Sequence, residues 1–114
     1  MTARCLIIGA AGQLGQALSA TLRSRYEVVE AVHRHPRPGQ LVIDLEDAAR
    51  TISVVAEVRP QWTLIAGAFC NVDRAETERE VCLQVNAHAP RAIAEYARRQ
   101  GAGVVFYSSD YTFD

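Results

Sequence analysis

The chain has 114 residues, a formal net charge of −1, 49% hydrophobic and 22% charged residues. This composition is typical of one globular domain and excludes a disordered chain. Nonspecific nucleic-acid binding needs a basic surface, and the near-neutral net charge argues against it. No apolar stretch approaches the roughly 18 residues of a membrane span, and the apolar start is too short for a signal peptide. We therefore expect neither nucleic acid nor a membrane as a partner.

The cysteines and the absence of lysine give further information about the type of protein. The three cysteines, Cys5, Cys70 and Cys82, are far apart and lack the spacing of metal-ligand pairs. We therefore expect a reduced, cytoplasmic protein without a metal site. All 12 basic residues are arginines, and the chain contains no lysine.

The first part of the chain alternates apolar runs with turns. Arg4 to Ile8 is predicted as a strand, and apolar residues between Leu14 and Leu22 recur at helical spacing. A valine-rich strand is expected from Tyr26 to Val32. The basic loop His33–Gly39 follows, because its prolines and glycine exclude regular structure, and a short strand then runs from Leu41 to Ile43.

The same alternation continues to the end of the chain. A helix is predicted from Leu45 to Ala56, with Asp44 as its cap. Trp62 to Ala66 is predicted as a strand, and a second helical pattern runs from about Glu76 to Gly101. Gly103 to Tyr107 is predicted as the last strand. Alternating strands and helices predict an α/β fold with a doubly wound, Rossmann-like parallel sheet in the order 3-2-1-4-5.

A glycine pattern, G-x-x-G-x-x-G, lies between the first strand and the first helix. Gly9 permits the tight turn, Gly12 leaves room for a pyrophosphate at the backbone N–H groups, and Gly15 lets the helix lie close to the sheet. The phosphates would then sit at the positive end of the helix. Alone the pattern is weak, and it can be a plain flexible turn. Its position after a strand favours dinucleotide binding.

The end of the second strand bears on the choice of cofactor. An acidic residue there takes the ribose hydroxyls of NAD, whereas a basic residue accommodates the 2′-phosphate of NADP. Glu30 falls inside the strand, while Arg34 comes just after it and can pair with a phosphate. We therefore predict NADP as the preferred cofactor, with NAD as the alternative. The other interpretation is a solvated basic loop, which we expect for His35 and Arg37.

Four segments together resemble the extended short-chain dehydrogenase/reductases, and within them the dTDP-4-dehydrorhamnose reductase type. They are the glycine loop 9–15, AGAFCNVDRAE at 66–76, VNAHAP at 85–90 and YSSDYTFD at 107–114. The resemblance implies a reductase that acts on the 4-keto group of a nucleotide-linked deoxysugar with NADPH or NADH. It also implies that residues 1–114 are the N-terminal, NAD(P)-binding portion of a longer, truncated reductase, with a homodimer left open for the full-length protein.

The resemblance also assigns roles to residues. Ser109 would hydrogen-bond the substrate carbonyl as a catalytic residue, with a polar strand cap as the alternative. Phe69, Asp73 and Asn86 would lie on the substrate side. The cofactor would be held by Gly9, Gly12, Gln13, Leu14 and Gly15 at the pyrophosphate, Asp44 and Leu45 near the adenine, and Ala66, Gly67 and Ala68 beside the ribose and nicotinamide.

Pro90 interrupts the second helical pattern. Proline has no N–H, so it cannot bond to the carbonyl of Asn86. Two interpretations stay open. Either the free carbonyl serves the active site, or a kink or helix start lies near Pro90.

The family's reductases protonate the developing alkoxide with a tyrosine whose pKa is lowered by a lysine four residues later. Because this chain has no lysine, we expect the 114 residues alone to be inactive. The alternative is a non-catalytic NADP-binding module resembling the regulatory subunit of methionine adenosyltransferase.

Overall fold

The computed structural model describes residues 2–66 and 84–107, apart from the side chain of Asn86. The described strands are β1 (Arg4–Ile8), β2 (Glu27–Val32), β3 (Leu41–Val42), β4 (Trp62–Ile65) and β5 (Gly103–Phe106). The described helices are α1 (Gln13–Leu22), α2 (Ala48–Val58), the π-helix η1 (Gln84–His88) and α5 (Ala89–Arg99). Each of the five predicted strands is present, with bounds within one residue of the prediction.

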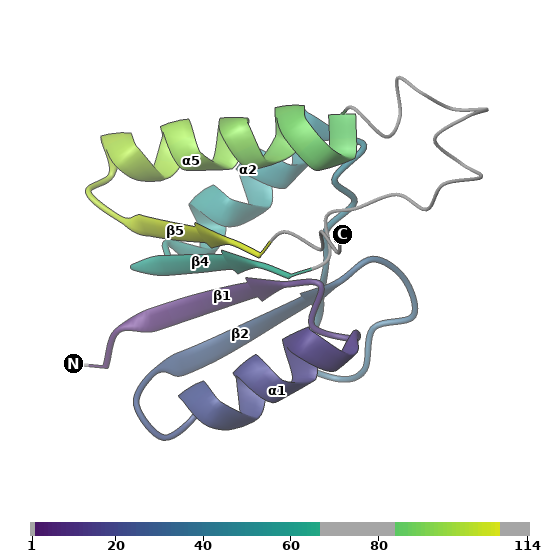
Figure 1. The fold of residues 1–114 in the computed structure, drawn as a ribbon, viewed down its shortest axis with the longest axis vertical. Coiled ribbons are helices and arrows are strands. Elements are labelled where there is room, and N and C mark those ends of the chain that lie inside the picture. The colour runs from purple at the N-terminus through teal and green to yellow at the C-terminus, as the bar shows by residue number, and fades with distance from the viewer. Residues whose placement is uncertain (1, 67–83, 108–114) are drawn as a thin grey trace, which may run out of the picture.

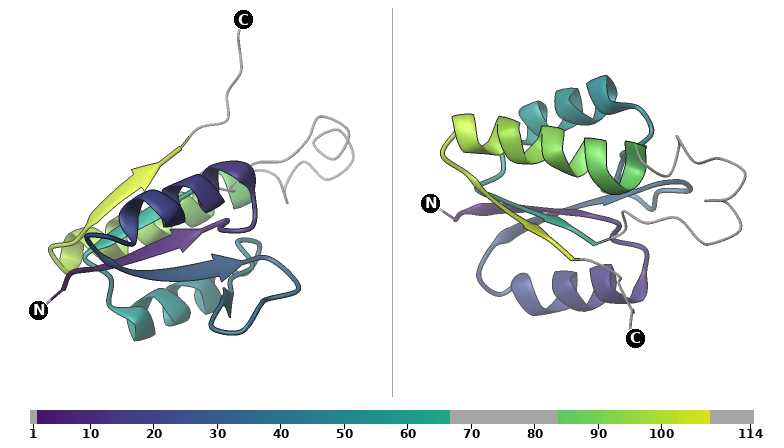
Figure 2. Two further views of the ribbon diagram at one scale, coloured as in Figure 1. Left: turned by 90° about the horizontal axis from the view of Figure 1, so that it is seen from below. Right: turned by 45° about the horizontal axis from the view of Figure 1, so that its top comes forward.

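The five strands form one parallel sheet in the order β3-β2-β1-β4-β5, which confirms the predicted topology. Helix α1 covers one face, and α2 and α5 cover the other (Figures 1 and 2). The order reverses direction at β1, because the chain moves outward from β1 to β3 and then returns to β4 on the opposite side. In open sheets of this kind, ligands bind beyond the carboxyl ends of the strands at that point.

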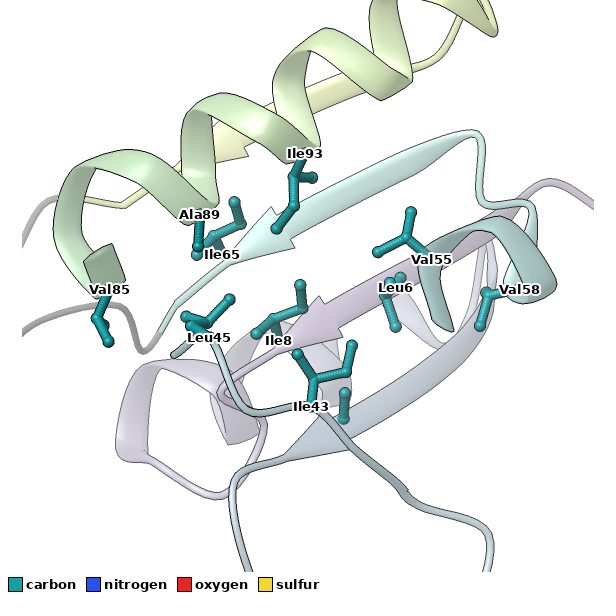
Figure 3. Packing of buried hydrophobic residues seen from close by; sticks show 11 residues of the cluster. Leu6, Ile8, Ile43, Leu45, Val55, Val58, Ile65, Val85, Ala89 and Ile93 are labelled. Atoms are coloured by element: carbon teal, nitrogen blue, oxygen red, sulfur yellow. The ribbon is translucent and has the colours of Figure 1, made fainter. Parts of the chain in front are cut away.

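Residues Cys5 to Ile8 of β1 are buried on both faces of the sheet, which explains why they form an apolar run. Leu6 and Ile8 point toward α2 and α5, where they pack with Ile65 of β4 and Ile93 of α5 (Figure 3). Cys5 and Ile7 belong to the second core cluster, on the α1 side. The central strand is thus fixed from both sides, and with it the position of the loop that follows at Gly9.

The N-terminus of α2 differs from the prediction. The helix begins at Ala48, and its cap is Asp47, whose carboxylate accepts a hydrogen bond from the Arg50 N–H at 3.1 Å. Asp44, the predicted cap, instead accepts from the N–H of Glu46 at 2.9 Å. Leu45 lies before the helix and is buried in the core. The predicted helix start was wrong because Leu45, although it fits the helical spacing of apolar residues, lies in the turn before α2 and is buried there.

This cap can be tested by stability measurements. Asp47→Ala leaves an N–H at the start of α2 without its acceptor, so we expect a loss of about 0.5–2 kcal/mol in the free energy of unfolding. Urea denaturation followed by circular dichroism measures it. Asp44→Ala is the matched control, and an equal or larger loss in that variant would contradict the assignment of the cap.

Pro90 lies in the first turn of α5, where the missing N–H does not interrupt the helix. The π-helix η1 precedes it and contains Asn86. The helix type therefore changes next to Pro90, from η1 to α5, in line with the second interpretation, and a role of the Asn86 carbonyl in the active site stays a prediction. Residues 76–83 of the predicted helix lie outside the described residues.

Candidate cofactor site

The turn between β1 and α1 is tied to the neighbouring strand. The N–H groups of Gly9 and Ala10 both donate to the carbonyl of Ala31 in β2, at 3.0 and 3.1 Å. Gly9 has a φ of 90°, a conformation that favours glycine. The side chain of Gln16 donates to the carbonyl of Ala11 at 2.8 Å. The loop is therefore held by strand and helix.

The N-terminus of α1 has free hydrogen-bond donors. The helix-capping residue is Gly12, which has no side chain to act as a cap, and the first intrahelical bond runs from the Gln16 N–H to the Gly12 carbonyl at 2.9 Å. The N–H groups of Gln13, Leu14 and Gly15 have no backbone partner within the described chain. Together with the helix dipole, these donors form a site suited to a phosphate.

Gly12 and Gly15 differ in the space around them. A Cβ at Gly15 would clash with the carbonyl oxygen of Gly9 and would lie 2.7 Å from the Cα of Ala10. The close approach expected at Gly15 is therefore present. A Cβ at Gly12 would meet only the Gly9 oxygen, at 3.8 Å. The fold thus requires glycine at position 15, while position 12 at the start of α1 has room for a side chain.

An open depression of about 550 Å³ adjoins the glycine loop. Ala11 and Gln16 line it on the α1 side, and Arg34 and Arg37 line it from the loop after β2. This loop and the β1–α1 loop leave the sheet at the same end (Figure 1). Neither guanidinium forms an ion pair or hydrogen bond with another described residue. The depression therefore offers positive charge along the flank of α1, from the glycine loop at Ala11 to Arg23.

Glu30 also lines this depression, and two neighbouring side chains donate hydrogen bonds to its carboxylate. Oε1 accepts from Gln40 Nε2 and Oε2 accepts from Arg23 Nη2, each at 2.9 Å. The hydrogen bond from Gln40, helped by the charge of Arg23, lowers the pKa of Glu30. Glu30 lies within β2, as the sequence indicates, and each of its carboxylate oxygens accepts a hydrogen bond from another side chain of the protein.

The other predicted cofactor residues lie along the same edge of the sheet. The Ala66 N–H donates to the Ile8 carbonyl at 2.8 Å, so Ala66 follows β4 directly beside the glycine turn. Asp44 Oδ1 lies 3.6 Å from His33 Nε2. The buried Leu45 offers its carbonyl to the amide of Gln84 at 3.3 Å. Asp44 and Leu45 thus connect the β3–α2 segment to the loop after β2 and to η1.

Several predicted residues cannot be placed. Gly67, Ala68, Phe69, Asp73 and Ser109 lie outside the described residues, and Asn86 is located in η1 by its backbone alone. Their roles stay predictions.

Three contributions to the site were not predicted from the sequence: Arg23, Gln16 and Gln40. Gln16 lies in α1, Arg23 is the C-terminal capping residue of that helix, and neither belongs to a recognised motif. The only signal near Gln40 is the Pro38-Gly39 pair before it, which is typical of a turn.

The described part of the chain shows no metal site, no reactive cysteine and no membrane-spanning helix. No group of three or more His, Cys, Asp or Glu side chains there could hold a metal ion. Cys5 is a free thiol, and burial raises its pKa, which makes it a poor nucleophile. None of the described helices is long and apolar enough to span a membrane.

Comparison with known proteins identifies the family. The model of the RmlD substrate binding domain matches residues 3–114. A dTDP-4-dehydrorhamnose reductase of Streptomyces griseus is 38% identical over 110 residues, which cover 96% of this chain and 34% of that protein. The beta subunit of methionine adenosyltransferase 2 from Xenopus tropicalis is 30% identical over 112 residues, with 97% and 34% covered. The chain thus spans about a third of the length of these relatives.

Solved structures agree with the family and the fold. A hypothetical dTDP-4-dehydrorhamnose reductase of Sulfolobus tokodaii superposes with a TM-score of 0.86 at 36% identity, covering 97% of this chain and 41% of that one. The Bacillus anthracis dTDP-4-dehydrorhamnose reductase in complex with NADP gives 0.80 at 32% identity, covering 99% and 38%. With the family model matching nearly all of its residues, the chain belongs to the RmlD substrate binding domain family.

Proposed function

We propose that this chain is the cofactor-binding part of an NADPH-dependent reductase acting on the 4-keto group of a nucleotide-linked deoxysugar. The observation that carries the proposal is the uncapped N-terminus of α1, with free N–H groups at Gln13, Leu14 and Gly15 beside a basic depression. Relatives named dTDP-4-dehydrorhamnose reductase, one of them solved with NADP, support the substrate and cofactor class.

Each group of residues in the proposed site binds a different part of the cofactor. The N–H groups at the start of α1 bind the pyrophosphate, and Gly12 keeps the approach open. Arg34 binds the 2′-phosphate in the depression, while Glu30 is engaged by Arg23 and Gln40 and does not compete. Asp44 and Leu45 contribute beside the adenine. Ala66, next to the Gly9 turn, starts the segment with Gly67 and Ala68 that passes the ribose and nicotinamide.

For the reaction, the bound nicotinamide supplies a hydride to the substrate carbonyl carbon. Ser109 donates a hydrogen bond to the carbonyl oxygen, and Phe69, Asp73 and Asn86 face the substrate. The alkoxide that develops needs a proton donor, and we assign that donor to a part of the protein beyond these 114 residues. Residues 1–114 are thus proposed as the N-terminal, NAD(P)-binding domain of a longer reductase.

Two measurements test the function. Calorimetric titration of the chain with NADPH and NADH shows whether the site binds a dinucleotide. Turnover of a dTDP-4-keto-6-deoxysugar by the longer protein then separates a reductase from a regulatory module like the methionine adenosyltransferase beta subunit. Tight NADPH binding with no turnover by the longer protein favours the module, and no dinucleotide binding at all refutes both.

Arg34 provides a test of cofactor choice. Arg34→Ala removes a charged donor to the 2′-phosphate, so NADPH binding is expected to weaken by about 1–3 kcal/mol while NADH binding changes little. Calorimetry on both cofactors measures the difference. The matched control is Arg25→Ala, because Arg25 is also an exposed arginine and lies just before the amino end of β2. Equal weakening of both cofactors by Arg34→Ala would assign the choice to another residue.

A further inference from the structure

The side chain of Gln40 links the basic loop to strand β2. Its Oε1 accepts a hydrogen bond from the Arg37 N–H at 2.8 Å, and its Nε2 donates to Glu30 Oε1 at 2.9 Å. The Gln40 backbone N–H also donates to the Arg37 carbonyl at 2.9 Å. One residue thus closes the turn at the end of the loop and attaches it to the strand.

The sheet places Gln40 where it can do this. Ala31 of β2 pairs with Leu41 of β3 in parallel register, so the residues before them, Glu30 and Gln40, are neighbours across the two strands. The turn Arg37-Pro38-Gly39-Gln40 has Gly39 at a φ of 89°, as position i+2 of a type II turn requires.

Glu30 extends the connection to helix α1. Its second oxygen accepts from Arg23 Nη2 at 2.9 Å, and Arg23 is the C-terminal capping residue of α1. The turn is therefore attached to β2 and α1, the two elements that also hold the glycine loop. Between Arg34 and this turn, the fixed φ of Pro36 restricts the backbone, so the position of the turn restrains the position of Arg34.

We propose that Gln40 is a positioning residue for recognition of the NADP 2′-phosphate: it holds the 33–39 loop closed against β2, so that Arg34 faces the depression before cofactor arrives. This inference rests on the proposed cofactor function. Without the Gln40 contacts, the loop has to be ordered when NADPH binds, which costs conformational entropy. NADH has no 2′-phosphate and does not need the loop.

The test uses Gln40→Met, which keeps the length of the side chain and removes its amide. We expect the NADPH-over-NADH preference, taken as the ratio of the two Kd values, to fall by about threefold to tenfold, the range that one net hydrogen bond supplies. The NADH Kd should stay within about twofold of the parent. Gln100→Met, at the exposed end of α5, is the matched control. A thermal melt verifies that each variant is folded.

A double-mutant cycle decides whether Gln40 acts through Arg34. In an Arg34→Ala background, Gln40→Met should no longer alter the preference, because residues that work as a unit are not additive. An unchanged preference in Gln40→Met, an equal weakening of both cofactors, or a full effect that persists without Arg34 would overturn the inference. If the parent chain binds neither cofactor, it is the proposed function that fails. Gln40→Ala serves as the second variant if Gln40→Met does not fold.

Discussion

Residues 1–114 alone are expected to bind NADPH but not to reduce a dTDP-4-keto-6-deoxysugar at an enzyme-like rate. Hydride transfer to a ketone leaves an alkoxide that must be protonated, and general acid catalysis alone is worth roughly 10²–10⁴-fold. The chain has no lysine to lower the pKa of a tyrosine. Tyr26 and Tyr107 pack against the core around Ile7, and Tyr96 packs on the opposite face of the sheet.

The measurement is steady-state oxidation of NADPH, followed by absorbance, with the isolated chain and with a longer protein that carries a Tyr-x-x-x-Lys pair. The longer protein is expected to be active, and in it Ser109→Ala should lower kcat more than it raises KM. Sugar-dependent oxidation of NADPH by the isolated chain, abolished by Ser109→Ala, would show that the missing lysine is not limiting.

The strand order could be predicted because it follows from local patterns. The apolar run from Cys5 to Ile8 in β1 indicates burial on both faces, and the alternation of strands and helices leaves few right-handed topologies. The glycine loop could be located for the same reason, since its position after β1 fixes where it lies in the sheet. Gly9 and Gly15 then have the turn and close approach that the pattern requires.

The cap of α2 could not be predicted, because Asp44 and Asp47 both precede apolar residues at helical spacing. The choice depends on contacts that are distant in sequence: Leu45 is buried in a core cluster with Val85 and Ala89, and its carbonyl accepts a hydrogen bond from Gln84, 39 residues away. The contact between Glu30 and Gln40 could not be predicted either. It depends on the register between β2 and β3, which a sequence pattern with period two does not specify. Local patterns therefore located the glycine loop at the end of β1, but not the contacts that attach the basic loop to β2.

Gly15→Ala is expected to destabilise the fold itself. The added methyl would overlap the Gly9 carbonyl oxygen and crowd the Ala10 Cα, both of which are backbone atoms. Relief requires the helix to move away from the loop, and overpacking of this kind costs about 1–3 kcal/mol. Urea denaturation measures the loss. A stability equal to the parent would show that α1 can shift away from the loop without penalty.

Gly12→Val, in contrast, is expected to leave the fold nearly intact and to abolish much of the NADPH affinity. Gly12 has a φ of −77° and a ψ of 173°, which any residue can adopt, and open space surrounds its Cβ position. The new side chain would stand between the phosphates and the N–H groups of Gln13 and Leu14. Losing one hydrogen bond to a charged group costs about 1.5–3 kcal/mol, or at least tenfold in Kd. If folded Gly12→Val binds NADPH as tightly as the parent in calorimetry, the pyrophosphate does not bind at the N-terminus of α1.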